Sequence, residues 1–222
     1  MNESRFVLPG DIITTGNYRM EQNVTVDGDK FMSTAIGFSE IKDDLITVNA
    51  LTGFYTPRID DLVIGKIVSH NALSWEVHIN SYYPGILLAS DIFGKDYSPS
   101  RDALSLKLNV GDIVLARIAN MGSRDPFISI VAYNLGRIDS GELTRMSPTR
   151  IPRLIGKRGS MIQMIEASTN ATLTVGQNGL VVLKCDNSTD LKKAITAVKM
   201  IGTVQNDANL EEKIKQFLDE GN

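Results

Sequence analysis

A change of hydrophobic periodicity near residue 140 places the strongest constraint on how this chain can fold. Before that point, apolar residues occur in short runs interrupted by turn-forming Gly, Pro, Asn and Asp residues, without helical spacing. After it, strand-like runs alternate with segments whose apolar residues recur every third or fourth position. The pattern predicts a multidomain α+β protein in which all-β modules precede a mixed one.

The 222 residues are enough for two or three small modules. We expect residues 1–58 to form an N-terminal all-β module, residues 59–139 a β-barrel, and residues 140–222 a mixed domain with a C-terminal helix. In the first module, β-type runs lie at 6–8, 12–13, 24–26 and 46–48. That module carries no group of reactive side chains, so packing or docking is its expected role.

The second module has the pattern of a five-strand barrel, with strands expected at 61–68, 75–79, 85–89, 112–118 and 127–131. Trp75, Val77 and Ile79 would share one face of their strand, so Trp75 is a predicted core residue. The positions of Gly65 and Gly85 before apolar runs make this module similar to an S1-type OB fold. That similarity implies binding of single-stranded nucleic acid.

The central strands depart from the S1-type pattern, because Glu76 and Leu88 stand where RNA-binding barrels present Phe and His. Cationic side chains elsewhere in the barrel are candidates for contact with RNA phosphates; they are Lys95, Arg101, Arg117 and Arg124. A plain solvated surface is the alternative for such scattered charges. His70 and His78 are interpreted as ordinary strand residues.

The net charge of −3 is unevenly distributed along the chain. Residues 140–206 hold nine basic and four acidic residues, a net +5, whereas 1–58, 59–139 and 207–222 carry −3, −2 and −3. Between Glu142 and Glu166 all the charged residues are basic: Arg145, Arg150, Arg153, Lys157 and Arg158. This concentration favours a polyanionic partner, with a solvated helix face as the alternative.

The third module is predicted to have the element order β-α-α-β-β-α. Its elements are expected as a strand at 142–146, a short helix ending at 155, a helix at 160–168, strands at 171–175 and 180–184, and a helix at 189–205. Thr149 is the expected N-cap of the first helix, whose first turn tolerates Pro152. The second helix would bury Met161, Ile162 and Ile165 on one face. A further short helix is expected within 207–222.

The loop Gly156–Gly159 separates the two short helices and carries the predicted chemistry. Its glycines allow close approach of a phosphodiester backbone, and the amides at the start of the second helix favour anions. Lys157 and Arg158 add positive charge. Beside the loop we expect a groove for unstacked bases, lined by Arg150, Arg153, Ile155 and Ile162.

This loop, placed between short helices and followed by a hairpin and a helix, resembles the loop with which KH domains clamp about four nucleotides of single-stranded RNA. With the run Val7–Asp11 and the barrel, the runs Ile151–Ile162 and Gly176–Gly179 resemble the KH-containing RNA-binding cap subunit of the archaeal exosome, the ribosomal-RNA-processing protein four type. In the expected hairpin 171–184, the turn residues Asn178 and Gly179 are of types that suit positive φ angles. The resemblance implies RNA contacts at Gly156, Lys157, Arg158, Gly159, Arg150, Arg153, Ile155, Ser160, Met161 and Ile162.

The same resemblance implies a non-catalytic subunit that sits with two copies of itself, as a homotrimeric cap, on a ring of RNase-PH-like exosome subunits. Single-stranded RNA would be captured at the KH loop and guided past the barrels into the central channel. Degradation from the 3′ end to the 5′ end would take place at sites in the ring. The N-terminal module would dock on that ring.

Other classes of protein fit the residues poorly. Cys185 is the lone cysteine, and with two histidines it cannot build a zinc cage, so no metal and no cofactor is expected. The pairs Asp43–Asp44 and Asp60–Asp61 would diverge to opposite faces of a strand, so no catalytic carboxylate cluster is expected. The apolar runs are too short to cross a membrane and the N-terminus lacks a signal-peptide pattern, which favours a cytoplasmic location.

Two alternative functions remain open from the sequence. A structural ring cap with little direct RNA binding would use the basic loop against a partner protein and residues 176–179 as an ordinary turn. A stand-alone S1/KH transcription or translation factor would share the module order. The bacterial elongation factor of that type carries two KH units, whereas this chain has room for one.

Overall fold

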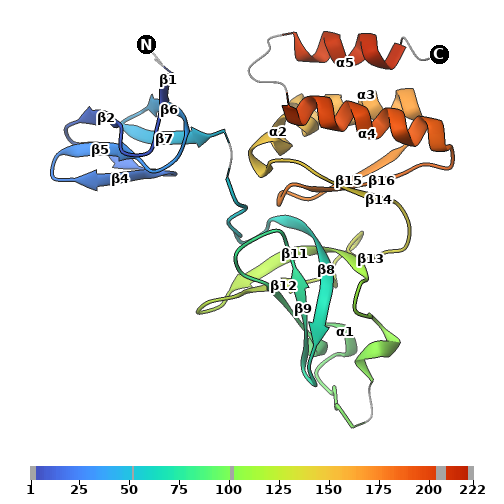
Figure 1. Cartoon of the computed structure of the whole chain (residues 1–222). Helices are drawn as coiled ribbons and strands as arrows, with labels where there is room; N and C mark the ends of the chain where they lie inside the picture. The colour runs from blue at the N-terminus through green and yellow to red at the C-terminus, as the bar shows by residue number, and fades with distance from the viewer. Residues whose placement is uncertain (1–3, 52, 101–102, 204–208, 220–222) are drawn as a thin grey trace. The chain divides into compact units, whose positions relative to one another are not determined.

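The computed structural model describes residues 4–51, 53–100, 103–203 and 209–219, with the elements labelled in Figure 1. The chain divides into two compact units, one ending at Gly53 and one beginning at Phe54. The division falls five residues before the expected boundary at 58. The second unit contains both the barrel and the mixed domain, because the two share a buried interface.

In the first unit, the described residues form seven strands in two small sheets. The four-stranded sheet has the order β1-β6-β7-β3, formed by Arg5–Val7, Gly37–Lys42, Leu45–Ala50 and Arg19–Met20. The three-stranded sheet has the order β2-β5-β4, formed by Ile12–Thr15, Lys30–Ser33 and Val24–Asp27. Val7, Ile46 and Val48 are fully buried. The described residues of this unit contain strands and no helix, so the predicted all-β character is confirmed.

The barrel of the second unit has the five strands that the alternation predicted. They are β8 (Leu62–His70), β9 (Ser74–His78), β10 (Gly85–Leu88), β11 (Ile113–Met121) and β12 (Pro126–Ser129). Their order is β12-β10-β9-β8-β11, and a further pairing of β11 with β12 closes the barrel. Helix α1 (Ala89–Phe93) and a 3-10 turn (Leu104–Leu106) lie between β10 and β11. Strand β13 (Gly136–Ile138) adds to the outer side of β11.

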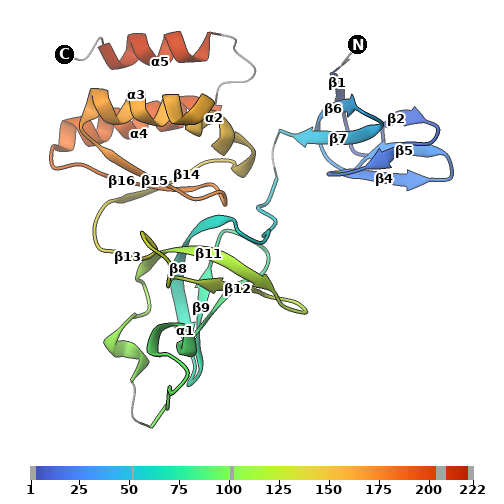
Figure 2. The ribbon, with the colours of Figure 1, turned by 180° about the vertical axis from the view of Figure 1, so that it is seen from behind.

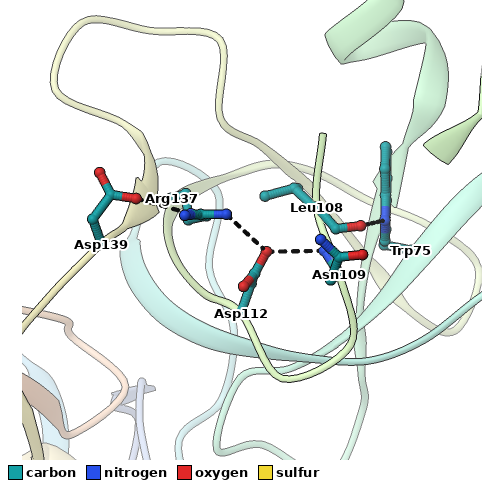
Figure 3. A network of polar contacts seen from close by, with 6 residues as sticks. All are labelled: Trp75, Leu108, Asn109, Asp112, Arg137 and Asp139. Carbon is teal, nitrogen blue, oxygen red and sulfur yellow. Dashed lines mark hydrogen bonds and ion pairs between the residues drawn. The ribbon is translucent and has the colours of Figure 1, made fainter. Parts of the chain in front are cut away.

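Trp75 is fully buried in the barrel, as the alternation predicted. Its indole nitrogen donates a hydrogen bond to the carbonyl oxygen of Leu108 at 3.1 Å, which satisfies the polar atom of a large buried side chain (Figure 3). This bond attaches the loop before β11 to the barrel core.

The same loop is tied to β13 by a small charged network (Figure 3). The Asp112 carboxylate accepts a hydrogen bond from the amide of Asn109 at 2.9 Å and pairs with the Arg137 guanidinium at 3.6 Å. Arg137 also donates to Asp139 at 2.8 Å. Because β13 leads directly into the mixed domain, the network holds the start of that domain against the barrel.

The mixed domain has the predicted β-α-α-β-β-α order followed by one more helix. Its strands are β14 (Glu142–Arg145), β15 (Thr172–Val175) and β16 (Leu180–Lys184), in the order β14-β16-β15. Its helices are α2 (Ile151–Ile155), α3 (Ser160–Thr169), α4 (Ser188–Thr203) and α5 (Leu210–Asp219). The predicted helix at 189–205 extends at its end beyond the described residues.

The expected N-cap role of Thr149 is wrong. Residues Pro148–Arg150 form a 3-10 turn that leads into α2, and Arg150 occupies the N-cap position. The Thr149 hydroxyl lies 2.8 Å from the Ser147 hydroxyl. The chain enters α2 from one tight turn, so the helix begins two residues after Thr149. Pro152 stands in the first turn, as expected.

Strand β16 is apolar along nearly its whole length because both of its faces are buried. Val181 and Leu183 belong to the core under the helices, which cover one face of the sheet in both views (Figure 1, Figure 2). Leu180 and Val182 form a second cluster with Ile64 of β8. The sheet is therefore packed between its own helices and the barrel, and this double burial fixes the position of the domain.

The turn Gly176–Gly179 joins the mixed domain to the barrel through buried hydrogen bonds. The fully buried Asn178 amide donates to the carbonyl oxygens of Ile64 at 2.6 Å and Ile79 at 2.8 Å, and accepts from the Ile64 amide at 3.2 Å. Gln177 makes a reciprocal pair with the backbone of Leu62, at 2.7 and 2.6 Å. This turn is therefore a clamp between two domains.

The expectation of positive φ angles in this turn is met at one of its two positions. Gly179 has φ +82°, and an added Cβ there would lie within contact distance of Met146 and Pro148. Asn178 does not take a left-handed conformation. Its role lies in the side chain, which reaches into the barrel.

We predict that Asn178→Ala lowers the free energy of unfolding by about 2–4 kcal/mol, because it leaves three buried backbone groups without partners. Denaturant unfolding of the full chain measures the change. Gln177→Ala is the matched control, and it should cost less because Gln177 is exposed and water can replace its side chain. Equal losses for the two variants would contradict the clamp.

Candidate nucleic-acid interface

Gly156 ends α2 in a conformation that favours glycine. Its φ is +72°, and an added Cβ would lie 2.8 Å from the amide nitrogen of Met161 and 2.9 Å from the Ser160 hydroxyl. These distances are too short for a side chain. The loop therefore packs tightly against the first turn of α3, and the chain reverses without a protruding side chain at this corner.

The other half of the loop is also left-handed. Arg158 has φ +54° and Gly159 has φ +86°, and Gly159 is the N-cap residue of α3. A left-handed arginine costs on the order of 1 kcal/mol, which the surrounding structure has to offset. Lys157 and Arg158 are both exposed. Two cations are thus held beside the positive end of the α3 dipole.

The apolar residues predicted to line the groove differ in burial. Ile155 is 36% exposed at the end of α2, and Ile162 and Ser160 are half-buried on α3. Met161 is only 2% exposed and belongs to the domain core, as the helical spacing indicated. Its side chain is therefore directed inward, and only its backbone lies next to the loop.

Arg150 is a buried cation close to Arg153. It is 7% exposed, and burial lowers the pKa of its guanidinium, with the charge of half-buried Arg153 lowering that pKa further. Among the described residues, none of the ion pairs involves Arg150. A buried charge without a counter-ion destabilises a fold, and a bound anion would relieve that cost.

The barrel cations come from separate elements. Lys95 follows α1 and Arg124 lies in the turn between β11 and β12; both are exposed. Arg117, half-buried on β11, donates to the carbonyl oxygen of Asp60 at 3.1 Å. Arg101 lies outside the described residues. Nothing in these contacts joins the barrel cations into one site.

The outer face of the central barrel strands carries neither Phe nor His at the two positions where the S1-type pattern predicts them. Glu76 is exposed on β9 and accepts a hydrogen bond from the Ser69 hydroxyl at 2.8 Å. Leu88 is exposed at the end of β10. His70 and His78 are exposed strand residues.

Residues 4–219, apart from the undescribed gaps, contain no cluster of three His, Cys, Asp or Glu side chains that could hold a metal ion. None of the described helices is long and apolar enough to span a membrane. Cys185 is half-buried and its thiol lies 3.5 Å from the carbonyl oxygen of Thr169.

Comparison with known proteins gives matches over the whole chain. The KH domain family model matches residues 143–200. Exosome complex component Rrp4 of Nitrosopumilus maritimus is 52% identical over 98% of this chain and 97% of its own length. The protein of the same name from Thermofilum pendens is 36% identical over 99% of this chain and 94% of its own length.

A solved structure also matches. A crystal structure provisionally described as an exosome complex RNA-binding protein has a TM-score of 0.72 and 32% identity, and the match covers 76% of this chain and 97% of that one.

The two loop glycines are predicted to differ in their tolerance of alanine. Gly156→Ala should lower the free energy of unfolding by about 2–4 kcal/mol, because a positive φ and a clash with the α3 backbone add together. Gly159→Ala should cost about 1 kcal/mol, because its nearest neighbour is the Gln163 side chain at 3.8 Å. Thermal unfolding compares them. A larger loss at Gly159 would contradict the loop geometry.

Proposed function

The chain belongs to the Rrp4 family of exosome complex components, and on that premise we propose that it captures single-stranded RNA at its KH loop. The observation that carries this proposal is the exposed pair Lys157 and Arg158 at the glycine-flanked start of α3. In this role the chain is a non-catalytic cap. It guides RNA into the central channel of an RNase-PH-like ring, where degradation runs from the 3′ end to the 5′ end.

The chemistry of the loop fits a phosphodiester backbone better than a neutral ligand. Gly156 and Gly159 place the backbone at the surface without side-chain bulk, and the first turn of α3 presents its positive dipole end. Lys157 and Arg158 form no ion pair within the described chain. An RNA strand would supply the missing counter-charges.

Arg150 adds a second argument for an anionic ligand. Arg150 is only 7% exposed as a residue and forms none of the ion pairs among the described residues, so its charge is costly for the free protein. We infer that Arg150 and Arg153 contribute a positive potential beneath the groove, while Ile155, Ile162 and Ser160 contact the bases. Met161 contributes its backbone at the loop.

A structural cap with little RNA binding is the second candidate function. It is favoured by the turn Gly176–Gly179, which is occupied by the clamp to the barrel, and by the replacement of stacking residues with Glu76 and Leu88. In that role the exposed cations of the KH loop would contact a partner protein instead of RNA. The proposal of RNA capture accounts for them.

The assembly we propose is a homotrimeric cap that acts in the cytoplasm and docks through its N-terminal module. Support comes from family membership and from large apolar residues exposed on this module, namely Phe6, Leu8 and Ile12. Exposed apolar side chains of this size are typical of protein-binding surfaces. The barrel cations Lys95, Arg117 and Arg124 are assigned to weaker, secondary contacts with RNA phosphates.

Charge reversal at the loop tests RNA capture. We predict that Lys157→Asp combined with Arg158→Asp weakens binding to single-stranded RNA about 10- to 100-fold, because two charge-assisted phosphate contacts become repulsive. Fluorescence anisotropy with a labelled oligonucleotide measures the affinity. Thermal unfolding should stay unchanged, because both residues are exposed.

The matched control is Lys192→Asp combined with Lys199→Asp, which makes the same change of charge on exposed positions of α4. This variant should retain most of the RNA affinity. Equal affinity of the loop variant and the wild-type protein would favour the structural cap.

Binding to ring proteins distinguishes an exosome cap from a stand-alone transcription or translation factor. We predict stable co-elution of the chain with RNase-PH-like ring proteins in size-exclusion chromatography, and no shortening of RNA by the isolated chain with phosphate and magnesium. Separate elution would favour a stand-alone factor. Robust degradation by the pure chain would remove the adaptor role.

A further inference from the structure

Two aromatic side chains stand exposed and in contact at the rim of the barrel. Phe54 is 72% exposed and Tyr82 is 76% exposed, and their ring centroids lie 4.7 Å apart with a tilt of 53°. Phe54 precedes the barrel strands, whereas Tyr82 lies in the loop between β9 and β10. Large rings that remain in water cost free energy, so their pairing at the surface calls for a functional explanation.

The Phe54 side of the pair is held by its buried neighbour. Tyr55 is buried, and its hydroxyl donates to the Asp61 carboxylate at 2.8 Å. Burial, followed by the hydrogen bond to Asp61, raises the pKa of Tyr55, so the hydroxyl remains a donor. Tyr55 also forms a parallel bridge with Ser81. This bridge sets the segment of Phe54 beside the segment of Tyr82.

The Tyr82 side is held by the domain clamp. Asn80 takes a left-handed conformation with φ +55°, and its side-chain amide donates to the carbonyl oxygen of Asn178 at 2.7 Å. Tyr83 donates its backbone amide to the Ser81 hydroxyl at 3.4 Å. Tyr82 therefore stands two residues from the contact between the barrel and the KH hairpin. These contacts anchor the chain on both sides of Tyr82 before any ligand arrives.

We propose that Phe54 and Tyr82 form a base-stacking site for single-stranded RNA that leads from the KH domain onto the barrel. This proposal rests on the RNA capture proposed above and adds a second contact to it. Exposed aromatic faces stack on bases of any sequence. The barrel has Glu76 and Leu88 on its central strands, and the rim pair supplies the stacking surface that those positions lack.

A nucleobase fits this surface better than a protein partner. A standard protein interface buries about 800 Å² on each partner, and two side chains supply a small part of that area. A base needs only one open ring face. The tilt of the pair leaves each ring with a face turned away from the other.

The test replaces the rings with apolar side chains that cannot stack, as Phe54→Leu with Tyr82→Leu. Affinity for a single-stranded RNA of about 20 nucleotides should fall about 5- to 50-fold, the range for loss of stacking on one or two bases. Affinity for a tetranucleotide, which the KH loop alone can hold, should stay unchanged. Tyr82→Phe keeps the ring and should bind the longer RNA like the wild type.

Salt dependence distinguishes stacking from charge. The leucine variant should keep the wild-type slope of log affinity against log salt, because both replaced side chains are uncharged. The loop variant with Lys157→Asp and Arg158→Asp should reduce that slope by about 0.7 for each phosphate that is no longer neutralised. Emission of the buried Trp75 reports whether either variant disturbs the barrel.

A direct signal comes from Tyr82→Trp, whose exposed indole emission should be quenched when RNA of about 20 nucleotides is added. If the leucine variant binds that RNA with wild-type affinity, the stacking site is overturned, whether or not the variant still co-elutes with ring proteins. The KH loop would then remain the RNA contact. Absence of RNA binding by the wild-type protein overturns both proposals.

Discussion

The buried amide of Asn178 is the interaction on which the arrangement of the second unit depends. From the tip of a KH hairpin, its three hydrogen bonds reach Ile64 in β8 and Ile79, the residue that follows β9. The backbone carbonyl oxygen of Asn178 also accepts a bond from the Asn80 side chain. A polar side chain buried at an interface is stable only when its bonding groups are matched. Because the hydrogen bonds of Asn178 are directional, they allow only one position of the KH hairpin on the barrel. Apolar contacts alone would permit several.

The apolar cluster around Ile64 and the clamp act together. Leu180 and Val182 face the barrel, whereas Val181 and Leu183 of the same strand face the helices. Strand β16 therefore fixes the position of the helical layer relative to the barrel. The loop Gly156–Gly159 is attached to that layer through α2 and α3. The helices on one face of the sheet thus carry the charged loop, and the aromatic pair of the barrel lies near the tip of the β15–β16 hairpin.

Much of the fold was readable from the sequence, because periodicity and turn residues are local signals. The five barrel strands, the buried Trp75 and the β-α-α-β-β-α order were all predicted and are confirmed. The N-cap was misplaced because a hydroxyl residue near a helix start is also compatible with a preceding 3-10 turn. Helical spacing placed Met161 in the core, and the residue is only 2% exposed there.

The modules, the basic charge of the third module and the glycine-flanked loop could be predicted from the amino-acid sequence, because each depends on residues close together in the chain. Three features depend on packing between distant segments: the hydrogen bonds of Asn178 to the barrel, the burial of Arg150, and the contact between Phe54 and Tyr82. Asn178 lies about a hundred residues from its partners in the chain, and the two rings are 28 positions apart. Contacts between residues so far apart in the chain form only when the domains pack. Periodicity and turn residues are local features of the sequence, so they cannot predict such contacts.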